Sequence, residues 1–161
     1  MNIFVLDYDP QKAAALHCDR HVIKMILESA QMLCSSIHCH DKSRAVKYKP
    51  THINHPCTIW ARKSRDNFMW LVQLSKALVD EHLLRYPRSS EHKSANVIRD
   101  CESLFHVIPK GYMTEFAQAM PDEYKKECAV DAYQEFYRKD KVRFATWKSP
   151  RSTPQFMLAG Y

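Results

Sequence analysis

The feature that most constrains the fold is a long stretch, residues 13–37, that contains neither proline nor glycine. Its apolar side chains recur at the spacing of one helical face. They are Ala13, Ala14, Leu16, Val22, Ile23, Met25, Ile26, Leu27, Ala30, Met32 and Leu33. The pattern predicts one long amphipathic helix. Because the whole chain of 161 residues holds only two glycines, we expect a mainly α protein.

A second, polar line runs along the same predicted helix. His17, His21, Lys24, Glu28 and Gln31 follow one another at steps of four, three, four and three residues, which places them on one face. One interpretation is a structural network in which Lys24 pairs with Glu28. The other is a cleft wall that carries a nucleophile or a base. In that second interpretation His21, Lys24 and Glu28 are catalytic, and His17 and Gln31 contact the substrate.

The remaining pattern predicts a single domain, residues 1–161, of about four to five helices. Residues 3–6 read as a short strand or an extended segment. Further helices are expected over residues 59–86, about 91–106 and about 129–145, and residues 107–123 read as an irregular connection. Aromatic side chains at helical spacing are more often core than stacking platforms, so we assign Phe68 and Trp70 to the core.

A stiff polar loop is expected at residues 48–60. It contains two prolines, and two histidines and an asparagine lie close together in it. Binding and catalytic groups are commonly presented by loops that a scaffold fixes. We therefore expect Thr51, His52, Asn54 and His55 to contact a substrate.

The charge of the chain favours an anionic partner. Its formal charge is +6 and its pI is about 9.0. Basic and aromatic side chains on loops and helix ends suit phosphate contact, although a solvated surface gives the same pattern. The residues expected to contact nucleic acid are Lys47, Lys49, Arg62, Arg65, Arg143, Trp147 and Lys148. We expect DNA or a nucleotide as the partner.

The cysteines and the first residues bear on location. Six cysteines are scattered without a CxxC pair, which favours reduced thiols. The apolar residues 2–6 are too short for a signal peptide or a membrane span. We expect a cytoplasmic protein without membrane contact, in the host cytosol if a phage encodes it.

Metal binding is a weaker alternative. His17 and His21, one turn apart, can share an ion, and His52, His55 or Cys57 complete a tetrahedral set for zinc. The HExxH pattern is absent because Cys and Asp follow His17. We expect no cofactor, with zinc as the alternative.

Two segments resemble a known family. Asp19-Arg20-His21-Val22 followed by Glu28 is similar to the opening helix of the phage endonuclease V type pyrimidine-dimer DNA glycosylases, and Lys49-Pro50-Thr51 is similar to their second segment. The opening Met-Asn-Ile-Phe, the HINHPC loop and residues 118–124 also resemble a set of small uncharacterised phage proteins. The second resemblance implies no activity.

The resemblance to the glycosylases implies a mechanism. Members attack the sugar C1′ with the α-amine of residue 2, after removal of Met1, and a glutamate assists imine formation and strand cleavage. Glu28 and His21 match the glutamate and the histidine of that family. The sequence departs from the pattern at Asn2, whose bulk normally prevents removal of Met1. Leu27 and Gln31 also stand where the family has basic residues.

Together these features predict a DNA-processing enzyme that acts on a base or its N-glycosidic bond, of the glycosylase and AP-lyase type. Glu28 is the expected acid and base, and Lys24 is a candidate amine. One alternative is a phage transferase or hydrolase that acts on a nucleotide or a modified base. The other is a non-enzymatic basic protein that binds DNA or a host protein.

Overall fold

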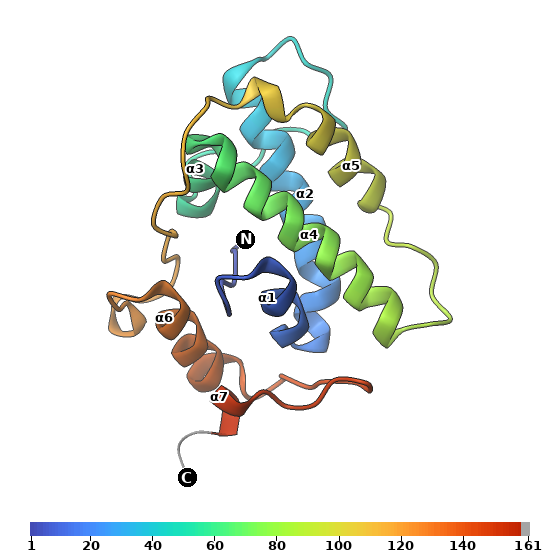
Figure 1. The fold of residues 1–161 in the computed structure, drawn as a ribbon, viewed down its shortest axis with the longest axis vertical. Coiled ribbons are helices and arrows are strands. Elements are labelled where there is room, and N and C mark those ends of the chain that lie inside the picture. Colours follow the sequence, from blue (N-terminus) through green and yellow to red (C-terminus); the bar gives the residue numbers. More distant parts are fainter. Residues whose placement is uncertain (159–161) are drawn as a thin grey trace.

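Helix α2, Asp19–His40, lies at the centre of the fold, and α3, α4 and α5 pack against it (Figure 1). The computed structural model describes residues 1–158. The other helices are α1 (Pro10–Leu16), α3 (Pro56–Lys63), α4 (Arg65–Arg85), α5 (Ala95–Ser103), α6 (Ala129–Phe136) and α7 (Gln155–Leu158). Short 3-10 turns, Phe105–Val107 and Asp122–Tyr124, lie in the connections. No strand occurs in residues 1–158, so the predicted mainly α single domain is confirmed.

The helix predicted over residues 13–37 is in fact two helices. His17 and Cys18 have extended backbones that separate α1 from α2. The guanidinium of Arg85 donates to the carbonyls of Ala15 and His17 at 2.9 and 2.8 Å, so it satisfies the free carbonyls at the end of α1. The N–H of Asp19 at the start of α2 donates to a carbonyl of the C-terminal tail. The prediction of one helix was wrong because these distant partners stabilise the break.

The helix predicted over residues 59–86 is also divided. Ser64 ends α3 and begins α4, and its hydroxyl caps α4 by accepting the N–H of Asn67 at 3.2 Å. Gly111 packs against this break, where an added Cβ would lie 3.0 Å from the Cβ of Ser64. The carbonyls of Pro109 and Gly111 accept backbone N–H groups from the first turn of α4. The extended segment before residue 112 thus stabilises the break.

The first residues form a buried segment that is neither helix nor strand. Residues 3–6 are at most 5% exposed, and the N–H of Leu6 donates to the carbonyl of Phe4 at 3.0 Å, which closes a tight turn. The ring of Phe4 stacks on His21 of α2, with centroids 4.4 Å apart, and packs edge-on against Tyr133 and Tyr137. The amino-terminal segment therefore runs between α2 and α6, which leads it to the middle of α2.

The last predicted helices are shorter than expected. Helix α5 spans less of the region 91–106, and α6 passes into a π-helical turn, Tyr137–Lys141, instead of continuing to residue 145. Residues 1–158 hold seven α-helices rather than the predicted four to five, because two breaks went unrecognised and α7 was not expected. Phe68 and Trp70 are 0% and 7% exposed, which confirms their assignment to the core.

Candidate functional site

Glu28 lies midway along α2 and is nearly buried, with 9% of its surface exposed. Its Oε2 atom lies 3.5 Å from the α-amine of Met1 and accepts the backbone N–H of Asn2 at 3.2 Å. Its Oε1 atom lies 3.2 Å from Nζ of Lys24, one helical turn earlier. One carboxylate and two amines therefore meet at a single place on α2.

The amino-terminal segment is fixed at this place by its first two side chains. The Met1 side chain is only 3% exposed, and Oγ1 of Thr58 lies 3.9 Å from its sulfur. The side-chain oxygen of Asn2 accepts hydrogen bonds from the hydroxyl of Tyr133 at 3.1 Å and from the thiol of Cys57 at 3.4 Å. Because these partners come from α3 and α6, the position of the amine depends on the assembled fold.

The predicted stiff loop is attached to both neighbouring helices. The backbone N–H and carbonyl of Thr51 each form a 3.0 Å hydrogen bond with the hydroxyl of Ser35 on α2. The guanidinium of Arg62 on α3 donates to the carbonyl of Ile53. His52 has a left-handed backbone, with φ of 48°, where the chain turns. The loop and α2 therefore meet along the edge that leads to Glu28.

His55 completes the cluster at the start of α3. Its Nδ1 atom accepts the N–H of Cys57 at 3.2 Å, so the imidazole caps the helix. Burial lowers the pKa of His55, the positive charges of the amino terminus and His52 lower it further, and the carboxylate of Glu28 opposes them. The imidazole is therefore close enough to the amine and to the carboxylate to respond to their charges, and it is mostly neutral at pH 7.

An amine beside a carboxylate in this arrangement is suited to imine chemistry. An unprotonated amine attacks an electrophilic carbon, and the carboxylate accepts and returns protons as the imine forms and breaks down. α-Amines are less basic than lysine side chains, so more of an α-amine is unprotonated at neutral pH. By this general difference the α-amine of Met1 is better suited to attack than Lys24, whose side chain is 59% exposed.

The two histidines of the predicted polar line lie in the interior. His17 is fully buried before the start of α2, and its Nε2 atom has no hydrogen-bond partner. Burial lowers the pKa of His17 to about 4, and burial together with the charge of His17 lowers the pKa of His21 to about 3. Nδ1 of His21 lies 2.6 Å from the hydroxyl of Tyr137. Both imidazoles are therefore enclosed, and Glu28 is nearly buried as well, whereas Lys24 is exposed on α2.

The other predicted substrate contacts lie around the cluster. Gln31 is half-buried on α2, one turn beyond Glu28. His52 and Asn54 are exposed at the tip of the loop, and the Thr51 hydroxyl lies 2.7 Å from Nδ1 of His52. The structure thus brings the amine, the carboxylate and the loop histidines to one region.

The predicted nucleic-acid contacts fall into two groups. Lys47, Lys49 and Arg143 are exposed. Arg62 and Arg65 instead make hydrogen bonds within the fold. The guanidinium of Arg62 donates to the loop, and Nη2 of Arg65 donates to two carbonyls that precede residue 109, each at 3.2 Å. The basic and aromatic pattern therefore combines surface charge with structural tethers.

The C-terminal residues of this pattern bind the break between α1 and α2. Nε1 of Trp147 donates to the carbonyl of Leu16 at 3.0 Å. The backbone N–H of Lys148 donates to the carboxylate of Asp19, also at 3.0 Å, and its Nζ lies over the ring of Tyr86. Trp147 and the backbone of Lys148 thus attach the tail to the helices.

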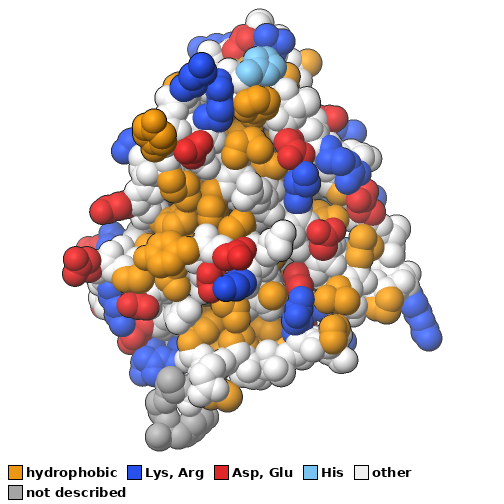
Figure 2. Space-filling view, in the orientation of Figure 1, with side chains coloured by type: hydrophobic (Ala, Val, Ile, Leu, Met, Phe, Trp, Pro, Cys, Tyr) orange, Lys and Arg blue, Asp and Glu red, His pale blue; other side chains and the backbone are white. Residues whose placement is uncertain are grey.

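The face that carries α4 has no broad basic surface, because Figure 2 shows acidic and basic side chains interspersed on it. Helix α2 differs. Its two acidic residues, Asp19 and Glu28, are buried, whereas Arg20 and Lys24 are exposed. The outer face of α2 is therefore basic beside the cluster.

The comparisons with known proteins give no family. No protein-family model, curated protein or solved structure matches the chain.

None of the helices in residues 1–158 has the length and apolarity needed to cross a membrane. Within the described residues no three or more His, Cys, Asp or Glu side chains are grouped to hold a metal ion, so the predicted zinc set is not assembled there.

The sequence did not single out the residues that position the amine. Asn2, Cys57 and Tyr133 hold the amino-terminal segment, and Tyr133 falls in the apolar stripe of the helix expected over about residues 129–145. A tyrosine in such a stripe gives no indication of its hydroxyl's partner. The one usable signal was Asn2, a polar residue directly before a buried apolar segment.

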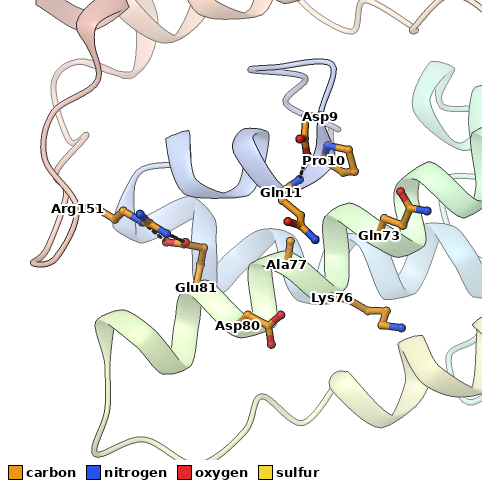
Figure 3. Close-up of a pocket in the computed structure, with 9 residues that line it drawn as sticks. All are labelled: Asp9, Pro10, Gln11, Gln73, Lys76, Ala77, Asp80, Glu81 and Arg151. Carbon is orange, nitrogen blue, oxygen red and sulfur yellow. Dashed lines mark hydrogen bonds and ion pairs between the residues drawn. The ribbon is translucent and has the colours of Figure 1, made fainter.

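A separate hollow lies between α1 and α4 and has a volume of about 870 Å³ (Figure 3). Arg151 from the tail pairs with Glu81 at one end of it, and Asp80 and Lys76 point outward from α4. The hollow is lined by Asp9, Pro10, Gln11, Gln73, Lys76, Ala77, Asp80, Glu81 and Arg151. None of these residues belongs to the Glu28 cluster, so the hollow is not part of the candidate site.

Proposed function

We propose that this protein is a DNA-processing enzyme that cleaves the N-glycosidic bond of a nucleotide and then the DNA strand, as a glycosylase with AP-lyase activity. The observation that supports the proposal most directly is the contact between Glu28 and the α-amine of Met1, at 3.5 Å. The resemblance of residues 19–28, in α2, to the endonuclease V type glycosylases also implies imine chemistry between an amine and the sugar C1′. In this proposal Glu28 is the acid and base.

The reaction proceeds through the amine. The amine nitrogen forms a bond to C1′ of the sugar while the bond from C1′ to the base breaks, and the base leaves with the electron pair and gains a proton. Glu28 accepts the proton that the amine loses. The bond from C1′ to the ring oxygen O4′ then breaks, Glu28 returns its proton to O4′, and the nitrogen and C1′ are left joined as an imine. Loss of a proton from C2′ then releases the 3′ phosphate and cleaves the strand.

DNA as the substrate is supported by charge. The chain carries a formal charge of +6, and Arg20 and Lys24 are exposed on the helix that carries Glu28. Lys47 and Lys49 are exposed before the loop. Basic side chains around a reactive site bind phosphates and set the register of the duplex. The base itself must leave the stack before the sugar can reach a group on the protein surface.

Two amines are candidates for the nucleophile, and we assign the role to the α-amine of Met1. It contacts the carboxylate of Glu28 at 3.5 Å, the adjoining Met1 side chain is only 3% exposed, and an α-amine is generally the weaker base. Lys24 then supplies positive charge beside the carboxylate of Glu28 and attracts phosphate.

Borohydride trapping tests the proposal. The protein is incubated with duplexes that carry a cyclobutane dimer, an abasic site or no lesion, reduced with borohydride, and digested for mass mapping. We expect a covalent adduct on the abasic duplex that maps to the peptide beginning at Met1. An adduct at Lys24 would reassign the nucleophile and keep the chemistry.

The absence of an adduct on every duplex would contradict the proposal. Turnover of free nucleotides without DNA affinity would then favour the nucleotide-acting alternative. DNA binding that survives replacement of both Glu28 and Lys24 and falls steeply with salt would favour the non-enzymatic alternative.

A further inference from the structure

Two large apolar side chains are exposed on α2 directly beside Glu28. Ile23 is 39% exposed and Leu27 is 40% exposed, and they lie one helical turn apart on the same face. Lys24 and Glu28 follow them in the sequence by one residue each. Each apolar side chain is therefore immediately next to a member of the reactive cluster.

This exposure is not a general property of the helix. The neighbouring apolar residues Val22, Met25 and Ile26 are at most 3% exposed, so the core-facing side of α2 is fully packed. The outward-facing side combines Ile23 and Leu27 with basic residues, and both acidic residues of α2 are buried. This combination fits an anionic partner that also offers an apolar interior.

Duplex DNA has both properties. Its phosphates attract the exposed Arg20 and Lys24, and its stacked bases offer apolar surface between neighbouring steps. Proteins that bend or open a duplex often insert Leu, Ile, Phe or Met side chains between bases. A protein that acts on a glycosidic bond also has to keep its target nucleotide out of the stack.

We propose that Leu27, assisted by Ile23, is a wedge that enters the base stack next to the target nucleotide. Insertion there fills the space that the extruded nucleotide leaves. Because Leu27 shares a face of α2 with Lys24, three residues earlier, and Lys24 pairs with Glu28, insertion brings the sugar of that nucleotide toward the amine and the carboxylate. This inference rests on the proposed function. It assigns the extrusion step to Leu27, which stands where the endonuclease V type glycosylases have an arginine.

A fluorescent base measures the insertion without chemistry. The probe is a duplex with a stable abasic analogue next to 2-aminopurine, whose fluorescence rises when it is unstacked. We expect the wild-type protein to increase the fluorescence and Leu27→Ala to lose most of the increase. Leu27→Met, which keeps a long apolar side chain, restores it. The matched control Leu84→Ala removes a 46% exposed leucine from α4 and leaves the increase unchanged.

Trapping on two forms of DNA separates the wedge from the chemistry. On a duplex with an abasic site, we expect Leu27→Ala to form the borohydride adduct at least about tenfold more slowly than wild type. Without the leucine, no side chain offsets the free energy of base stacking that is lost when the target nucleotide leaves the duplex. On a single strand with the same site, the two proteins react at equal rates. Equal rates on both forms would overturn the wedge and leave the proposed function intact.

The trapping and fluorescence experiments distinguish failure of the proposed function from failure of the wedge. If the wild-type protein forms no adduct on either the duplex or the single strand, the proposed function fails, and the fluorescence experiment still reports whether Leu27 enters the stack. If wild type does not raise the fluorescence at all, the wedge is overturned whatever the trapping shows.

Discussion

Among single residues, Tyr133 fixes the position of Asn2 and, through it, of the amino terminus. The hydroxyl of Tyr133 lies 2.8 Å from the carbonyl of Ala117 and 3.1 Å from the side-chain oxygen of Asn2, two acceptors that share its single proton, and it accepts the N–H of Ala119. Burial raises the pKa of Tyr133, so the hydroxyl stays protonated and available as a donor. Tyr133 is therefore a positioning residue for the amino terminus.

Tyr133→Phe should destabilise the fold and slow the reaction together. Loss of the hydroxyl removes the hydrogen bonds of the part-buried Ala117 carbonyl and Ala119 N–H, which costs about 1–3 kcal/mol of unfolding free energy. Urea denaturation measures the cost, and the rate of borohydride trapping on an abasic duplex measures the positioning effect. The control Tyr112→Phe changes a residue that is 89% exposed and should alter neither quantity. A Tyr133→Phe protein with wild-type stability would contradict this role.

At the scale of elements, the break between α1 and α2 is stabilised by a buried ionic network. Arg85 is 0% exposed, donates to the carboxylates of Asp19 and Glu81, and binds the last carbonyls of α1. The tail adds a hydrogen bond from Thr146 to Asp19 and the pairing of Arg151 with Glu81. The network joins α1, α2, α4 and the tail.

Arg85→Met should destabilise the protein strongly. It leaves the buried carboxylate of Asp19 without the cation that pairs with it and leaves Glu81 paired with Arg151 alone, and breaking a buried ion pair typically costs about 3–5 kcal/mol. The matched control Arg99→Met breaks the exposed pair with Glu91 and should cost at most about 1 kcal/mol. Urea denaturation of both variants gives the comparison. Equal losses in the two variants would show that the network contributes nothing beyond an ordinary surface pair.

The same break shows how far the sequence predicts this fold. Apolar spacing located every long helix, because the apolar side chains of a buried helix face recur at helical spacing in the local sequence. It did not locate the ends at His17 and Ser64, because the groups that satisfy the backbone there come from Arg85 and from the segment before residue 112. Ser64 carries a local capping signal, but it lies inside an otherwise continuous apolar pattern.

At the scale of the whole molecule, the candidate site depends on three segments that are far apart in the sequence. The pair Lys24 and Glu28 follows from helical spacing alone. The arrival of the amino terminus at Glu28 does not, because it results from burial of residues 3–6 between α2 and α6. The inward position of His21 was equally hidden, since its partner Tyr137 lies in a distant π-helical turn.

The buried histidines make the stability of the whole fold depend on pH. Burial lowers the folded-state pKa of His17 to about 4 and of His21 to about 3, below the value of about 6.5 for an unfolded chain. As the pH falls, the unfolded chain therefore binds protons first. Stability is fully present above about pH 6.5 and decreases toward pH 4, by about 1.4 kcal/mol per pH unit for each histidine.

Urea denaturation at a series of pH values between 7 and 4 checks this expectation. His21→Gln should reduce the slope of stability against pH, whereas the control His106→Gln changes an exposed residue and should leave it unchanged. A stability that does not change over this range in the wild-type protein would show that the two imidazoles do not stay neutral in the fold.

The central claim is that the Glu28 carboxylate and its neighbouring amine form a catalytic centre, and Glu28→Gln tests it most directly. The substitution keeps the size of the side chain and removes its ability to accept a proton. We expect borohydride trapping on an abasic duplex to slow by about 100-fold or more, with unfolding close to wild type. The control Glu102→Gln, which breaks the exposed pair with Lys76, should trap at the wild-type rate. Wild-type trapping by Glu28→Gln would contradict the account.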